Sequence, residues 1–131
     1  MRNILVLLFF TLSSCESVAD CIVGIKPELV EKTFSNGNTF QHYRDIIAFN
    51  MKRADTEDYF ISEVSVDGDL PPGINYSLEN LRTIILDGNP NTRGTYNFRF
   101  KITVRPYIFN EDGGDNLCGN VAENDYTITI D

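Results

Sequence analysis

The fold of this chain is decided by the stretch Thr95-Tyr96-Asn97-Phe98-Arg99-Phe100-Lys101-Ile102-Thr103-Val104. Aromatic and aliphatic residues occupy every second position, and polar or charged residues occupy the positions between them. This period of two places the apolar side chains on one face of a β-strand and the polar ones on the other. A helix repeats every 3.6 residues and cannot have this pattern. The stretch therefore predicts a strand with one face in a core and the other in water.

Further strands are predicted on both sides of this stretch. They are Asp45–Lys52, Phe60–Val66, Ile74–Leu78, Thr83–Leu86 and a closing strand that carries Tyr126, Ile128 and Ile130. In the second of these, Phe60, Ser62, Val64 and Val66 are expected to share one face. Six or seven short strands predict an all-β fold, a two-sheet antiparallel sandwich. One brief helix is expected within residues 26–34, starting near Pro27.

Turn residues separate the predicted strands. Asp67-Gly68-Asp69 ends one strand, Glu79-Asn80 and Gly88-Asn89-Pro90-Asn91 are turns, and Pro71-Pro72-Gly73 marks a rigid crossing, because proline lacks the amide hydrogen of a central strand. A longer loop, rich in Gly, Asn and Asp, runs from Tyr107 to Val121.

The first fifteen residues have the pattern of an export signal. Arg2 supplies a positive charge, Ile4 to Leu12 form an uncharged apolar run, and Leu12-Ser13-Ser14-Cys15 closes it. The run has nine residues, which is too short to cross a bilayer, since that needs about 20 residues. The pattern resembles the lipobox of bacterial lipoprotein precursors.

This resemblance implies that the Cys15 thiol receives diacylglycerol, that a signal peptide, residues 1–14, is cleaved off, and that the new amino terminus is acylated as well. Two or three acyl chains anchor a protein firmly where one chain binds only marginally. Residues 15–20 are then a lipidated tether, and residues 21–131 form the folded domain. The alternative is an ordinary secretory signal in which Cys15 happens to follow two serines.

Length and charge limit the function classes. Removal of residues 1–14 leaves 117 of the 131 residues, which suffice for one domain with one core. The net charge of −8 becomes −9, because the removed segment contains Arg2 and no acid. Phosphate backbones and anionic headgroups repel such a chain, so we expect no nucleic acid partner, and membrane attachment must come from the lipid.

Three cysteines in an exported chain leave one to be explained. The lipid accounts for Cys15, so Cys21 and Cys118 are predicted to form a disulfide bond in an oxidising compartment. By chain-entropy reasoning, a loop of that size stabilises the fold by about 4 to 5 kcal/mol, less any native strain. The alternative is a pair of unpaired buried thiols. A zinc site is not expected, because two sulfurs and His42 do not complete four ligands.

The second half of the chain resembles a known domain family. The segments that carry the resemblance are Leu70–Ile74, Thr83–Pro90, Gly94–Phe98 and Tyr126–Ile130. In this order they resemble the immunoglobulin-like (Ig-like) domain family of bacterial surface proteins, which is similar to cadherin-like and dystroglycan-type modules. The resemblance covers residues 70–130 and implies an Ig-like sandwich after the signal peptide. Leu86 and Asn89 interrupt the glycine-rich segment of the family, and the chain has no Trp.

Each element of this resemblance also has a physical reason. Gly73 allows a positive φ after the two prolines, and Ile74 returns an apolar side chain to the core. Tyr96 is expected at a corner where its ring packs inward and its hydroxyl reaches a backbone partner.

The residues of a catalytic or metal site are not found together. The only histidine, His42, lies in a polar stretch, and no serine stands in a glycine-flanked elbow, so we expect no enzyme and no cofactor. We interpret His42 and the neighbouring pair Glu57-Asp58 as solvated surface. Asp67, Asp69 and the acidic residues after Tyr107 have hard oxygen ligands, but they lack the spacing of a calcium loop, so no metal site is predicted.

The leading hypothesis is a lipid-anchored, non-enzymatic module of the bacterial envelope, expected at the outer membrane, that binds a protein or glycan through loops or a sheet edge. Long loops on a rigid scaffold usually carry recognition. The predicted contact residues are Tyr107, Asn110, Glu111, Asp112, Asp115 and Asn116. The alternative is a periplasmic inhibitor or immunity lipoprotein that blocks a basic toxin or lysozyme with its acidic surface.

Overall fold

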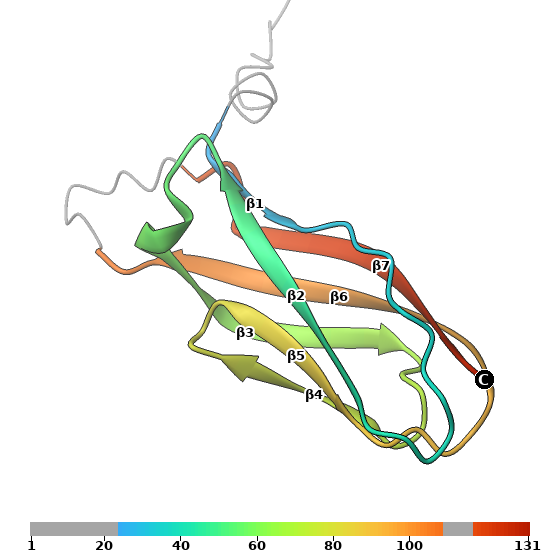
Figure 1. The fold of residues 1–131 in the computed structure, drawn as a ribbon. Helices are drawn as coiled ribbons and strands as arrows, with labels where there is room; N and C mark the ends of the chain where they lie inside the picture. The colour runs from blue at the N-terminus through green and yellow to red at the C-terminus, as the bar shows by residue number, and fades with distance from the viewer. Residues whose placement is uncertain (1–23, 109–116) are drawn as a thin grey trace, which may run out of the picture.

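The computed structural model describes residues 24–108 and 117–131. Seven strands and one 3₁₀ helix make up this part of the chain, arranged in two layers (Figure 1). The strands are β1 (Lys26–Leu29), β2 (Tyr43–Lys52), β3 (Tyr59–Gly68), β4 (Ile74–Glu79), β5 (Thr83–Gly88), β6 (Gly94–Pro106) and β7 (Val121–Ile130), and the helix η1 spans Thr56–Asp58.

The strands form two sheets in which all neighbours are antiparallel. One sheet has the order β1-β2-β5-β4 and the other β3-β6-β7. With the strands lettered A to G along the chain, this is the ABED and CFG order of a constant-type immunoglobulin domain. The fold class expected from the sequence is confirmed: the described chain is an all-β, Ig-like antiparallel sandwich.

Strand β6 is the central strand of its sheet, as its sequence pattern predicts. It pairs with β3 on one side and with β7 on the other. Its apolar side chains Phe98, Phe100, Ile102 and Val104 are at most 3% exposed. Arg99, on the opposite face, binds Asp125 of β7 at 2.7 and 3.0 Å. The alternation therefore separates a core face from a charged outer face.

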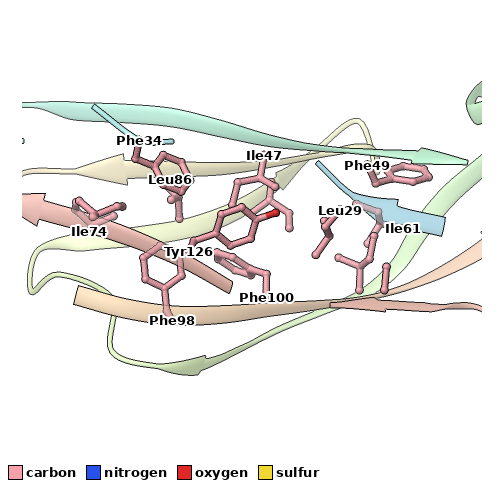
Figure 2. Close-up of a cluster of buried hydrophobic side chains, with 14 of the residues drawn as sticks. Leu29, Phe34, Ile47, Phe49, Ile61, Ile74, Leu86, Phe98, Phe100 and Tyr126 are labelled. Atoms are coloured by element: carbon pink, nitrogen blue, oxygen red, sulfur yellow. The ribbon is translucent and has the colours of Figure 1, made fainter. Parts of the chain in front are cut away.

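Both sheets contribute side chains to one core between them. Figure 2 shows Ile47, Phe49 and Leu86 from one sheet facing Phe98, Phe100 and Tyr126 from the other. Aromatic rings fill its middle. Phe98 lies edge-on to Phe100 at 5.7 Å between centroids, and Tyr126 lies edge-on to Phe34 at 5.6 Å.

The brief helix predicted within residues 26–34 is wrong. Residues 26–29 form β1, which pairs with the end of β2, and no helix follows it before residue 34. Leu29 and Phe34 are both buried in the core. An extended chain lets Leu29 and Phe34 enter the core at two separate points along the edge of the sandwich. A helix of this length would bring the two side chains close together on one face.

Strand β3 departs from its expected period. Ile61 pairs with Val104 and Glu63 pairs with Thr103, so Ser62 is an extra residue in a β-bulge. One added residue moves the side chains before it to the other face. Ile61 is therefore buried, while Phe60, which was expected beside Val64, lies on the outer side of the sheet.

The predicted turns connect the strands with one small shift. Gly73 has a φ of +97°, and Ile74 after it is buried, as expected. The β4–β5 turn is centred on Asn80 and Leu81, with φ of 51° and 56°, one residue later than predicted. Positive φ at both central residues is typical of a type I′ hairpin. The Tyr96 hydroxyl donates to the Thr92 carbonyl at 3.0 Å, which confirms the expected corner.

The sandwich has two distinct ends. Residues 24–26 enter the fold at the end that also holds η1, the β4–β5 turn and the end of β6, and we call this the N-terminal end (Figure 1). The last residue, Asp131, lies at the opposite, C-terminal end, together with the turns before β2, β4 and β6.

Candidate functional site

An exposed apolar cluster lies at the N-terminal end. It consists of Phe60, Leu81, Arg82, Tyr107 and Ile108, and we call it the Tyr107 cluster. The rings of Phe60 and Tyr107 are 4.9 Å apart, and the Arg82 guanidinium lies over the Tyr107 ring at 5.8 Å. Ile108 is 79% exposed, Tyr107 49% and Leu81 46%.

Backbone hydrogen bonds hold the cluster in place. The Tyr107 N–H donates to the Asp58 carbonyl at 2.9 Å, and the Ile61 N–H donates to the Leu81 carbonyl at 2.7 Å. Beside Tyr107 and Ile108 lies a shallow hollow of about 460 Å³, whose other lining residues are Glu57, Asp58, Tyr59 and Pro106. The cluster is thus an ordered surface with an acidic border.

Only part of the predicted recognition loop belongs to the described structure. Tyr107 is described and exposed, whereas Asn110, Glu111, Asp112, Asp115 and Asn116 lie outside the described residues. Sequence reasoning missed Phe60 of β3 and Arg82 of the β4–β5 turn, which contact Tyr107, and Leu81 beside Arg82. The alternation pattern indicated the opposite face for Phe60, because it cannot reveal a bulge.

At the C-terminal end, Phe40 is 80% exposed and has a φ of 60°. Its N–H donates to the Pro90 carbonyl at 2.7 Å, and the Thr39 N–H donates to the Asp131 carbonyl at 3.0 Å. A positive φ is unfavourable for a residue with a Cβ atom, and nothing in the core compensates for it here. Phe40 is therefore an apolar side chain held in water by a fixed backbone.

His42 lies near Phe40 and is exposed, as expected. It also has an acidic partner that the sequence did not reveal, because His42 Nε2 is 3.1 Å from Asp87 Oδ2. Arg44 Nη1 approaches the same oxygen at 3.5 Å. The register of β2 on β5 brings these residues together from 43 and 45 positions apart. All three side chains are well exposed, so the group forms a surface ion cluster.

A groove separates the edge strands β1 and β7. It has a volume of about 730 Å³, and Glu28, Glu31 and Glu123 are among its lining residues. No backbone ladder joins these two strands in the described chain. Isolated bridges flank this edge, Ile25–Leu117 at one end and Gly37–Ile130 at the other, and side chains of β7 bind the Leu29 and Val30 carbonyls between them. The groove is acidic and open to water.

The cysteines are only partly described. Cys118 is disulfide-bonded, and its N–H donates to the Ile25 carbonyl at 2.8 Å. Cys15 and Cys21 lie outside the described residues. Cys21 is four positions from Ile25, a distance of at most about 14 Å along an extended chain. This is consistent with the pairing of Cys21 and Cys118, which stays a prediction.

Within residues 24–108 and 117–131, no group of three or more His, Cys, Asp or Glu side chains is arranged to hold a metal ion. Asp67 and Asp69 belong to this range, whereas the acidic residues from Glu111 to Asp115 do not. The same range contains no helix with the length and apolarity needed to cross a membrane.

Comparison with protein families found no match, and comparison with curated protein sequences found none either. Several solved structures are similar in fold. The endo-fucoidan hydrolase MfFcnA9 of glycoside hydrolase family 107 matches over 88% of this chain with 16% identity and a TM-score of 0.52. The match covers only 18% of that hydrolase. The titin M3 domain matches over 80% of this chain and 96% of its own length, with 12% identity and a TM-score of 0.45. At these identities the likeness concerns the fold alone.

Proposed function

We propose that this protein is a lipid-anchored, non-enzymatic binding module of the bacterial envelope, at the outer membrane, which contacts a protein or glycan through its loops. The observation that supports binding most is Phe40, an exposed aromatic side chain on a backbone fixed by hydrogen bonds. A fixed anchor loses little conformational freedom on binding, which favours affinity. The anchor itself rests on the lipobox that ends at Cys15.

The length of the tether limits how far the N-terminal end of the domain lies from a lipid on Cys15. Gly24, the first described residue, is nine positions after Cys15, and this stretch spans at most about 32 Å when extended. A lipid on Cys15 therefore keeps the domain within this distance of the membrane, with the tether joined to the N-terminal end and Phe40 at the opposite end. The Tyr107 to Val121 loop starts at the N-terminal end, so it and the Phe40 loop are two separate candidates for partner contact.

Lipid attachment is tested by radiolabelled palmitate in cells, followed by intact-mass measurement of the protein from envelopes. We expect label on the natural chain and none on Cys15→Ala. Cys21→Ala is the matched control and is expected to keep the label. An unmodified Cys15 in envelope protein, or label that survives Cys15→Ala, refutes the anchor.

Partner contact is tested by photocrosslinking in intact cells. A photoreactive amino acid replaces Phe40, Asn110 or, as a control on an exposed strand face, Asn75. We expect a crosslink to one envelope component from position 40 or 110, and none from 75. The same products from all three positions contradict a specific loop surface. Protease treatment of whole cells shows which side of the outer membrane the domain faces.

The alternative function is inhibition of a basic enzyme, and the groove between β1 and β7 favours it. Glu28, Glu31 and Glu123 outnumber Lys26 in the lining of this groove, although Lys52 pairs with Glu28 and Arg99 with Glu123. The remaining negative charge, with the net charge of the chain, attracts a basic partner during association. Lysine at positions 31 and 123 is expected to abolish recovery of a basic hydrolase in a pull-down if this function is correct. Recovery of envelope assembly components that survives both changes favours the loop-binding module.

A further inference from the structure

Exposed apolar side chains are concentrated at one end of the molecule. Six large ones are exposed in the described part of the chain, and four of them lie at the N-terminal end: Leu81, Tyr107, Ile108 and Val121. The other two, Phe40 and Ile46, lie elsewhere. Single exposed apolar residues are ordinary, whereas a group of them on one surface indicates a binding surface.

Leu81 shows that this surface is not a product of fold stability. It occupies the second central position of the β4–β5 turn with a φ of 56°, where Gly is strongly preferred. A leucine there has backbone strain, and its side chain is nearly half exposed. Leu81 thus combines an unfavourable backbone conformation with an apolar side chain exposed to water.

The chemistry of the Tyr107 cluster suits the boundary between lipid and water. Leucine and isoleucine side chains are stable among acyl chains, and tyrosine is enriched at the headgroup level because its ring is apolar and its hydroxyl polar. Arg82, above the Tyr107 ring, places a cation at the level of the lipid phosphates. Glu57 and Asp58 border the cluster and disfavour an anionic surface.

We propose that the Tyr107 cluster docks on a zwitterionic lipid bilayer, with Leu81 and Ile108 in the interfacial layer and Arg82 among the headgroups. This inference rests on the proposed lipid anchor, which places the N-terminal end within reach of the membrane. The anchor alone leaves the domain free to rotate on its tether. Docking fixes its orientation, so that Phe40 points away from the bilayer toward a partner.

The absence of Trp from the sequence makes a direct test possible. Ile108→Trp and Phe40→Trp each introduce a single fluorescent reporter, at positions that are 79% and 80% exposed. The mature chain from residue 15 is coupled through the Cys15 thiol to a maleimide lipid in vesicles of phosphatidylethanolamine and phosphatidylcholine, with or without brominated acyl chains. Brominated chains are expected to reduce the emission at position 108 about twofold and to leave position 40 unchanged.

A second variant separates docking by the cluster from insertion of the new Trp itself. Ile108→Trp combined with Leu81→Gly and Tyr107→Ser is expected to lose the quenching, with an unchanged circular dichroism spectrum. Quenching that survives these changes overturns the proposal, as does equal quenching at positions 40 and 108 or none at 108. A protein crosslink from position 108 in cells, without quenching in vesicles, assigns the cluster to a protein partner and also overturns it.

The vesicle experiment does not depend on the cellular modification. If the natural protein has no lipid on Cys15 but the quenching appears, the anchor fails and the affinity of the cluster for bilayers stands. If the lipid is present and the quenching is absent, the anchor stands and the docking surface is refuted. Replacing the zwitterionic lipids with phosphatidylglycerol is expected to weaken the quenching, because the mature chain carries a net charge of −9.

Discussion

Loss of a single hydroxyl, by Tyr126→Phe, is expected to weaken the edge where the two sheets meet. The Tyr126 hydroxyl donates to the Val30 carbonyl at 2.9 Å, and Asn124 Nδ2 donates to the Leu29 carbonyl at 3.3 Å. These side-chain bonds stand in for the backbone ladder that β1 and β7 lack in the described chain. Removing one of them tests how much the edge depends on side chains.

The expected loss of unfolding free energy is about 1 to 1.5 kcal/mol. A net hydrogen bond contributes about 0.5 to 1.5 kcal/mol, and a buried carbonyl left without a partner costs about 1 to 3 kcal/mol. Val30 is only partly buried, so water can reach its carbonyl, and the lower part of the range applies. The ring keeps its place against Phe34 and Phe98, so no cavity adds to the cost.

Urea unfolding monitored by circular dichroism measures this loss directly. We expect a lower midpoint with an unchanged slope, which indicates a change in stability without a change in exposed surface. Tyr76→Phe is the matched control, because Tyr76 also packs edge-on against Phe100, and its hydroxyl binds no described residue. An equal loss in both variants, or a loss for Tyr126→Phe below about 0.3 kcal/mol, refutes the reasoning.

Four further predictions follow from the described residues. Burial raises the pKa of Tyr43 and of Tyr126 to about 12. The two hydroxyls therefore stay protonated to a higher pH in the folded state than in the unfolded state, where tyrosine has a pKa near 10. Stability is therefore complete below pH 10 and declines as the pH rises through 12, which tyrosinate absorbance and alkaline unfolding together measure. Gly73→Ala is expected to cost at least about 2 kcal/mol in urea unfolding, because φ is +97° and the added methyl would overlap the Asn89 carbonyl oxygen. Cys118→Ser removes a disulfide and is expected to cost about 2 to 5 kcal/mol in the same assay, the upper end applying if native strain is small. Leu81→Gly relieves a positive φ and is expected to raise stability by about 0.5 kcal/mol, and a measured loss contradicts the strain argument.

The parts of the fold that the sequence predicted are those with local causes. The alternation from Thr95 to Val104 made β6 a strand, because every second side chain is apolar over the whole stretch. Gly73 and Tyr96 took their expected places for the same kind of reason, since a positive φ and a corner hydroxyl depend on nearby residues.

The errors have non-local causes. Leu29, Val30 and Phe34 have spacings that also suit a helix, and only pairing with β2 makes residues 26–29 a strand. The bulge at Ser62 depends on the register with β6, where Thr103 accepts a hydrogen bond from the Ser62 hydroxyl at 3.1 Å. A single sequence contains no direct signal of either partner.

The candidate sites were harder to predict than the fold, for a related reason. Of the predicted loop residues, only Tyr107 is described, and its neighbours Phe60 and Arg82 come from β3 and the β4–β5 turn. The His42–Asp87 pair likewise depends on the register of β2 with β5. Sequence reasoning named Tyr107 as a contact residue and interpreted His42 as solvated surface, and strand pairing brought the other members of each group beside them.

Phe40 and Leu81 share a property that connects these sites. Both have a positive φ, both are exposed, and they lie at opposite ends of the sandwich. If stability alone determined these positions, glycine or asparagine would suit both backbones better, and a polar side chain would suit both surfaces. Natural proteins tolerate such local costs mainly at functional sites. Under the proposed function and the proposed docking surface, Leu81 marks the membrane-facing end and Phe40 the partner-facing end. Substitution at either end is then expected to impair one contact without unfolding the domain between them.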